Sequence, residues 1–175
     1  MGRPTDRRLL APADGVGGAP AKSRSGGRGD DIEMGELPDL IGFNLRCAQV
    51  STFQHFSKTV GEAEISPPQY GTLILIESNP GISQSAIASA LRFDRSTLVQ
   101  IIDRLEERGL VVRAVSARDR RSHALKLTDE GNRVLQDLKR RVTAHEAHIT
   151  RELSAEEKES LIELLARLHQ TPFAD

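Results

Sequence analysis

The chain has 175 residues, which suits one domain, and 38% of them are apolar, which is enough to form a core. No apolar run is long enough to span a membrane, and the start of the chain lacks the continuous apolar stretch of a secretory signal. A single cysteine excludes an intrachain disulfide, and these features together indicate a protein of the reducing cytoplasm. The formal net charge of −1 excludes a chain that is basic throughout, so any surface for a polyanion has to be local.

Residues 1–36 are rich in Gly, Pro, Ala, Ser and charge and nearly free of aromatic residues. Such a segment cannot bury enough surface to offset its ordering entropy, so we expect a disordered basic arm. Six basic residues minus two acidic ones up to position 28 give the arm a charge of +4. The arm either adds non-specific nucleic-acid affinity through counterion release or is a solubilising extension without a specific role.

Two helices are predicted after the arm. Asp39 can cap the first helix, which runs to about residue 60. Arg46 lies on the apolar stripe of this helix, which is made by Phe43, Val50 and Phe53. The second helix starts after Ser66 and stops at an Asn-Pro-Gly sequence, residues 79–81.

The next two predicted helices are short and nearly contiguous. Ser83 can cap a helix whose apolar face ends at Leu91, and Asp94 can cap a second helix that ends before Gly109. Two helices joined by so few residues must cross steeply. This spacing is typical of a helix-turn-helix, in which the start of the second helix meets base edges in the major groove of DNA.

The exposed early side chains of the second helix are of types that bind phosphates and base edges. A Gln suits adenine, and an Arg suits guanine. The candidate DNA-binding residues on this helix are Arg95, Ser96, Thr97, Gln100 and Arg104.

A charged β-hairpin is predicted after this helix. Residues 110–112 and 124–127 form its strands, and the turn ARDRRS forms a wing tip with four further candidate DNA-binding residues, Arg118, Asp119, Arg120 and Arg121. From position 92 to 126, nine basic residues minus five acidic ones give a local charge of +4. Positive charge therefore gathers where the motif would face DNA, although a solvated helix and hairpin in an unrelated fold would show the same residues.

Two more helices complete the chain. Thr128 can cap a long helix that runs to about residue 152, and Ser154 begins a capping box for the last helix. The first and last helices have broad apolar faces that a small winged core cannot cover. Pairing them across a two-fold axis would give a homodimer with two recognition helices, and hence a pseudo-palindromic DNA site with half-sites about one helical turn apart.

The segments DRST, DRLEERGLVVR and DRRSHALKLT resemble the multiple-antibiotic-resistance regulator (MarR) family of bacterial transcription factors. The resemblance implies a mainly α fold with a small β-hairpin wing. It implies a MarR-type domain over residues 37–170, with a winged helix-turn-helix at about 66–127 between dimerisation helices at about 39–60 and 128–170. It further implies a sequence-specific regulator that acts as a repressor in the bacterial cytoplasm.

The resemblance also implies a role for the wing tip. In the family an Asp-x-Arg sequence places its arginine in the minor groove, and here these positions are Asp119 and Arg121. Two positions depart from the family pattern. Arg92 stands where many members have Gly, so the turn is either less tight or strained at Arg92, and Ser116-Ala117 replaces an Asp-Pro at the start of the wing.

Members of the family commonly bind aromatic carboxylates or their coenzyme A thioesters between the dimerisation helices and the winged core. The resemblance therefore implies such an effector, which would release the repressor from DNA. Arg46 can anchor its anionic group, or can form an intersubunit salt bridge instead. The other candidate effector-binding residues are Val50, Phe53 and Tyr70.

Other functions are less well supported by the residues. No nucleophile-elbow, phosphate-loop or zinc-protease spacing occurs, so neither catalysis nor a cofactor is predicted. His145, His148 and Glu152 could hold a sensed metal, although two histidines without a cysteine pair are more often solvated or lie at a core edge. Cys47 could sense oxidants, although we expect it to be a small core residue. An architectural, non-specific DNA-binding protein without an effector is the remaining alternative.

Overall fold

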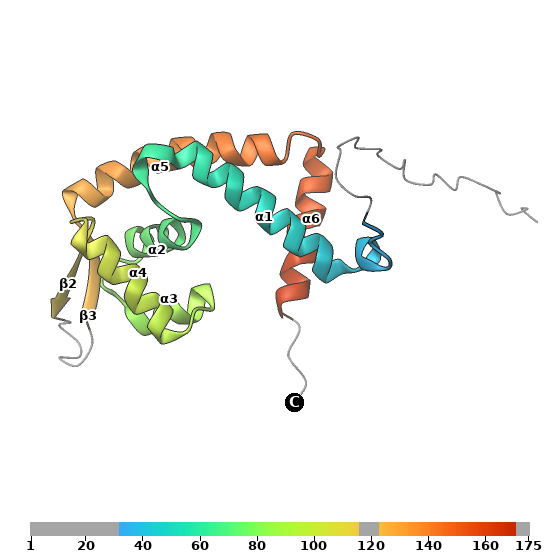
Figure 1. The fold of residues 1–175 in the computed structure, drawn as a ribbon. Helices are drawn as coiled ribbons and strands as arrows, with labels where there is room; N and C mark the ends of the chain where they lie inside the picture. Colours follow the sequence, from blue (N-terminus) through green and yellow to red (C-terminus); the bar gives the residue numbers. More distant parts are fainter. Residues whose placement is uncertain (1–31, 116–122, 171–175) are drawn as a thin grey trace, which may run out of the picture. The chain divides into compact units, whose positions relative to one another are not determined.

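A computed structural model describes residues 32–115 and 123–170, and the fold below is that of the compact unit that begins at Glu36. Its six α-helices are α1 Ile41–Val60, α2 Pro67–Ser78, α3 Gln84–Leu91, α4 Arg95–Glu107, α5 Asp129–Ile149 and α6 Ala155–Gln170 (Figure 1). Its strands are β1 Ile82–Ser83, β2 Val111–Val115 and β3 His123–Leu127. Within the described residues, no helix is long and apolar enough to cross a membrane. The mainly α fold with a small antiparallel sheet was predicted correctly.

Side-chain caps start the helices of the winged core where the sequence predicts. The Asp94 carboxylate accepts from the Thr97 amide at 2.8 Å, and the Ser83 hydroxyl accepts from the Ala86 amide at 3.2 Å. These bonds satisfy amides that a helix start leaves without an internal partner. Further caps lie at Ser66, Thr128 and Ser154.

The start of α1 differs from the prediction. Asp39 belongs to a short 3₁₀ turn, and Leu40 is the residue before the helix, without a side-chain cap. The Asn44 amide group instead donates to the carbonyls of Pro38 and Leu40, both at 2.8 Å, and so ties the turn to the helix.

The sheet has the order β1-β3-β2, and both pairings are antiparallel. The predicted hairpin is confirmed by pairs that run from Val111 with Leu127 to Val115 with His123. The two-residue strand β1 was not predicted, because Ile82 and Ser83 are too few to show an alternating pattern. It pairs with β3 and so fixes the start of α3 against the wing.

A single apolar core lies within the winged part of the unit. Its most completely buried side chains come from all of α2 to α5 and from β3, and include Leu73, Ile87, Leu98, Ile102, Leu125 and Leu135. Phe56 and Val60 bring the end of α1 into this core. The core therefore holds α3 and α4 in one fixed orientation.

Helix α6 and the first half of α1 are not covered by the rest of the unit. No residue of α6 is buried in the chain, and in α1 burial begins only at Phe56. A groove of about 450 Å³ runs between them, and its apolar lining includes Ile41, Leu45, Leu161, Leu164, Leu165 and Leu168. Such a contiguous apolar surface marks a site of association.

Candidate nucleic-acid interface

The first turn of α4 presents the side chains that the sequence predicts for DNA contact. Arg95, Ser96, Thr97 and Gln100 are exposed, while Leu98, Ile102 and Leu105 on the other side of the helix are buried. Arg104, one turn further on, is also exposed. The wing-tip candidates Arg118, Asp119, Arg120 and Arg121 lie outside the described residues, as do residues 1–31 of the basic arm.

A hydrogen-bond network ties the first turn of α4 together. The Thr97 hydroxyl donates to Asp94 Oδ2 at 2.6 Å, and the Ser96 hydroxyl donates to Asp94 Oδ1, which also accepts from the Thr97 amide. The hydrogen bond from the Ser96 hydroxyl, and then those from Thr97, hold the pKa of Asp94 well below its usual value. Asp94 is therefore an ionised, acceptor-only group at the edge of the recognition surface.

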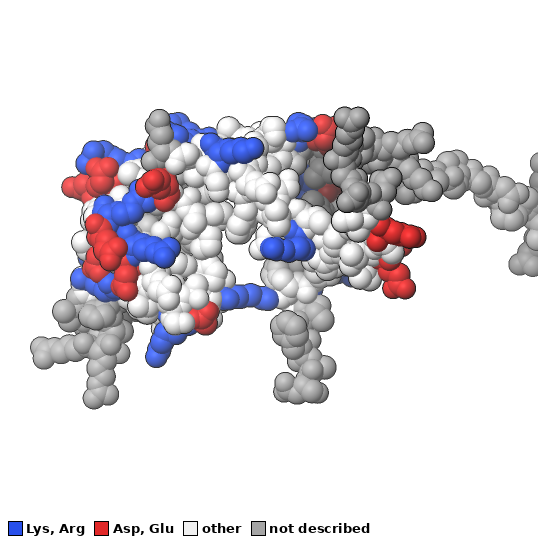
Figure 2. Space-filling view, in the orientation of Figure 1, with Lys and Arg blue, Asp and Glu red and all other residues white. Residues whose placement is uncertain are grey.

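Two of the basic residues between positions 92 and 126 bind other parts of the chain. Arg113 on β2 donates to Asp103 Oδ1 at 2.5 Å and to Glu106, so its guanidinium joins the wing to α4. Arg108 donates to the carbonyls of Ala63 at 2.7 Å and Glu64 at 3.0 Å. On the face that Figure 2 shows, the blue and red side chains of the described residues lie intermixed.

Arg92, at the end of α3, has left-handed backbone angles, with φ 55° and ψ 38°. An Arg at this position was expected to give either a less tight turn or a strained backbone, and the structure has the strained backbone. The Arg92 guanidinium reaches the end of α6, where it contacts the His169 ring at 3.2 Å and donates to the His169 carbonyl. This contact joins the helix-turn-helix to the last helix.

The four predicted effector residues differ in their exposure. Arg46, Val50 and Phe53 lie on the exposed surface of α1, whereas Tyr70 is half-buried with its ring centroid 6.1 Å from that of Phe56. Burial raises the pKa of the Tyr70 hydroxyl, an effect opposed by the nearby Lys139.

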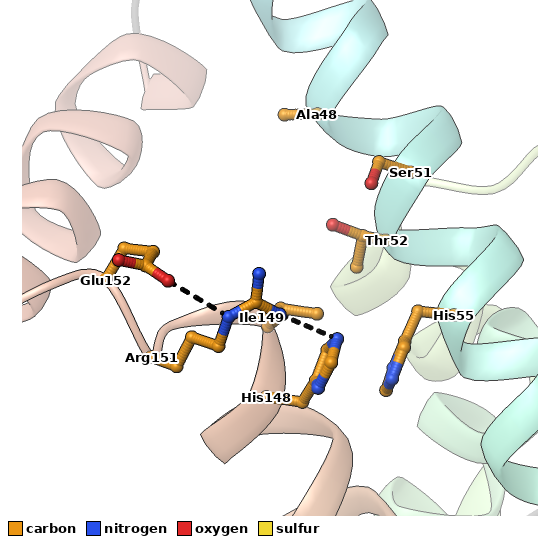
Figure 3. A pocket seen from close by; sticks show the side chains of 8 residues that line it. All are labelled: Ala48, Ser51, Thr52, His55, His148, Ile149, Arg151 and Glu152. Atoms are coloured by element: carbon orange, nitrogen blue, oxygen red, sulfur yellow. Dashed lines mark hydrogen bonds and ion pairs between the residues drawn. The ribbon is translucent and has the colours of Figure 1, made fainter.

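A different set of residues lines a polar pocket of about 340 Å³ between α1 and the end of α5 (Figure 3). From α1 come Ala48, Ser51, Thr52 and His55, and from the other wall come His148, Ile149, Arg151 and Glu152. None of the four predicted effector residues lines this pocket. The family resemblance places the effector cleft along these helices, but sequence reasoning chose other side chains for it, because the two walls lie about one hundred positions apart in the chain.

Two histidines, His55 and His148, line this pocket, and the His145 ring lies next to that of His55. His55 Nδ1 and His145 Nδ1 are 2.7 Å apart, so exactly one of these nitrogens carries the shared proton. The His55 ring stacks on that of His148, with centroids 4.0 Å apart. Burial lowers the pKa of both His145 and His148, and the contact between His148 Nε2 and the Arg151 guanidinium at 3.0 Å also favours a neutral ring.

The structure bears on the two sensing alternatives. His145 is 2% exposed, so it lies within the core edge rather than in an open ligand position. Within the ranges 32–115 and 123–170, no group of three or more His, Cys, Asp or Glu residues is arranged to hold a metal ion. Cys47 is exposed, so its predicted place in the core was wrong: it lies on the first half of α1, in which no residue is buried.

Comparison with known proteins agrees with this architecture. A sequence model of the MarR family matches residues 63–122. A protein of Thauera aromatica, assigned as a transcriptional regulatory protein for the hcr operon, is 38% identical over 141 residues, which cover 80% of this chain and 85% of the relative.

Solved structures agree as well. The transcriptional repressor CouR, bound to a 23-mer DNA duplex, is 38% identical with a TM-score of 0.76, over 80% of this chain and 99% of that chain. CouR bound to p-coumaroyl-CoA is 36% identical with a TM-score of 0.75, over 81% of this chain and 100% of that chain. The relatives agree with the exposed start of α4 and with the paired strands of the wing. This chain is a DNA-binding transcriptional regulator, not an enzyme, and it belongs to the MarR family.

Proposed function

We propose that this protein is a homodimeric repressor that binds a pseudo-palindromic operator in the bacterial cytoplasm and is released by an aromatic carboxylate or its coenzyme A thioester. The observation that carries the proposal is the joint exposure of two surfaces, the first turn of α4 and the apolar groove of α1 and α6. Relatives bound to a DNA duplex and to p-coumaroyl-CoA support both parts of the proposal, DNA binding and effector binding.

The dimer is proposed to form by burial of α1 and α6 against a second copy. Leu164 is 57% exposed in one chain, and its neighbours Leu161 and Leu165 are 43% and 37% exposed. Burying a leucine stabilises an interface by about 1.5–3 kcal/mol, so Leu164→Glu is expected to give a folded monomer. Sedimentation velocity measures this, with Glu159→Lys on the same helix as the control, and a dimeric Leu164→Glu variant would contradict the proposed interface.

The DNA-reading surface is proposed to combine the exposed residues of α4 with the wing tip. Arg121→Ala should weaken operator binding, and Asp119→Ala should do so less, because the carboxylate only orients the arginine. Gln100→Ala should change sequence preference more than affinity for random DNA, since a good bidentate base contact gives about 1–3 kcal/mol of discrimination. Gel-shift titrations at fixed salt measure all three, and unchanged affinity for Arg121→Ala would remove the wing from the mechanism.

The effector is proposed to bind across α1 and the end of α5. The pocket offers hydroxyls, imidazoles and the Arg151 guanidinium, which suit a phenol or a carboxylate, and Arg46 on α1 is proposed to hold an anionic group of the same ligand. Arg46→Ala should then leave a folded dimer that binds operator but is not released by p-coumaroyl-CoA. If Arg46 instead pairs with the other subunit, the same variant will melt earlier and bind DNA more weakly without ligand.

The experiment that tests the whole proposal compares one selected operator with random DNA across a salt series. A specific regulator binds its operator on the order of a thousandfold or more tighter than random DNA at physiological salt. Equal affinities would indicate the architectural, non-specific alternative.

A further inference from the structure

The network at the start of α4 has a consequence for base recognition, which rests on the proposed reading of DNA by this helix. A hydroxyl group has one proton to donate and two lone pairs to accept with. The Thr97 and Ser96 hydroxyls both donate to Asp94, whose carboxylate can only accept. Both side chains are exposed, so what they offer to a partner outside the helix is lone pairs.

The two hydroxyl protons are held firmly in this arrangement. The distance of 2.6 Å from Thr97 Oγ1 to Asp94 Oδ2 is that of a charge-assisted bond, which is roughly twice as strong as a neutral one. Turning either proton outward would replace a bond to a full negative charge by a bond to a neutral base atom. The hydroxyls are therefore poor donors to guanine N7, guanine O6 or thymine O4.

The major groove presents groups of both kinds. Adenine and cytosine carry amino groups that donate, whereas guanine and thymine offer mainly acceptors at the positions that a short side chain reaches. A side chain that offers only lone pairs accepts a hydrogen bond from adenine or cytosine. Opposite guanine or thymine, it faces other lone pairs and gains no hydrogen bond.

Capping alone does not explain a carboxylate at position 94. Asn caps a helix as well as Asp does, and a negative charge beside DNA phosphates opposes binding. What the carboxylate supplies, and an amide does not, is two acceptor oxygens without a donor.

We propose that Asp94 is a positioning residue that sets the hydrogen-bonding polarity of the recognition helix. By holding the hydroxyl protons of Ser96 and Thr97, it makes these two side chains acceptors, which select adenine or cytosine where they meet the bases.

The substitution Asp94→Asn tests this with little change of shape. The amide oxygen still accepts from the Thr97 backbone, while the new NH₂ group donates to the Thr97 hydroxyl and frees its proton to point outward. Enrichment of a randomised DNA library on the full-length protein gives the base preference at every position. The wild type should enrich adenine or cytosine at one or two positions of each half-site. Asp94→Asn should shift the position that Thr97 meets toward guanine or thymine by about fivefold or more, whereas Ser96 still donates to the amide oxygen and its position should not shift.

Thr97→Val supplies the matched control, because it removes the hydroxyl and keeps the side-chain shape. It should weaken the preference at one position, and in the Asp94→Asn, Thr97→Val double variant the Asn should no longer shift that position. Thermal melts of all four proteins show that the fold is kept.

The outcomes separate the inference from the proposed function. A wild type that enriches no sequence refutes both. A clear wild-type consensus that Asp94→Asn leaves unchanged refutes this inference alone, whether the variant binds all DNA more tightly, as a plain charge effect, or more weakly, as the loss of a cap.

Discussion

Gly131, the third residue of α5, is where the long helix approaches the backbone that follows α4. A Cβ atom at this position would lie 2.0 Å from the Leu110 carbonyl oxygen and 2.9 Å from its carbon. Ordinary contact begins at 3.4 Å, so the two backbones would have to separate by about 1.4 Å, the difference between 3.4 and 2.0. The same oxygen accepts from the Thr128 amide at 3.1 Å, and the separation would break this bond.

The cost of Gly131→Ala follows from two opposing effects. Overpacking of this kind costs about 1–3 kcal/mol, and a backbone clash falls at the upper end of that range. Alanine in a helix gains about 1 kcal/mol over glycine. The expected net loss is about 2 kcal/mol, which lowers the Tm of a domain of this size by about 4–8 °C.

Gly71 in α2 provides the control, because a Cβ there would lie 3.6 and 3.8 Å from the Leu91 side chain, which is ordinary contact. Gly71→Ala should therefore melt at or above the wild-type temperature. Circular dichroism melts of the three proteins under one buffer condition measure the difference. A Gly131→Ala variant as stable as Gly71→Ala would refute the close seating of α5 on the start of the wing.

Three further predictions concern the histidines, Arg113 and Arg92. Folding lowers the pKa values of His145 and His148 from 6.5, so the stability that these residues contribute is present above pH 6.5 and lost as the pH falls below it. The Tm of the wild type should therefore drop between pH 7.5 and 5.5. A drop of the same size in His145→Gln would contradict this prediction. Arg113→Ala leaves two carboxylates unpaired beside the recognition helix, so it should cost about 1 kcal/mol in urea unfolding and weaken binding to all DNA, and unchanged DNA affinity would count against the ion pair's role. Arg92→Gly should be more stable than Arg92→Ala by about 1 kcal/mol, the reverse of ordinary helix propensity, because only glycine adopts the left-handed backbone without cost; the opposite order in thermal melts would exclude that backbone.

The winged core could be predicted because its signals are local. Caps such as Asp94 and Thr128 act within three residues, and the left-handed Gly109 ends α4 where the sequence places the stop. Apolar spacing within each helix then fixed which face is buried.

The side chains that line the pocket and the partners in the ion pairs could not be predicted in the same way. His55 and His145 are ninety positions apart, and only the packing of α1 on α5 joins their rings. Arg113 was counted among the positive charges that face DNA, but its partners lie on another element and neutralise it. Cys47 was expected in the core because α1 has a broad apolar face, whereas only the last part of that face is covered within one chain.

We propose that this regulator binds a specific DNA sequence and releases it when an aromatic acid derivative binds to the protein. The most direct measurement is a fluorescence anisotropy titration of the full-length protein on the DNA beside its own gene and on a scrambled duplex, with and without p-coumaroyl-CoA, at physiological salt. We expect tight binding to the first duplex and binding at least a thousandfold weaker to the second. This difference in affinity should disappear when the thioester or a related aromatic acid is added. Equal binding to both duplexes, unaffected by any of these compounds, would contradict it.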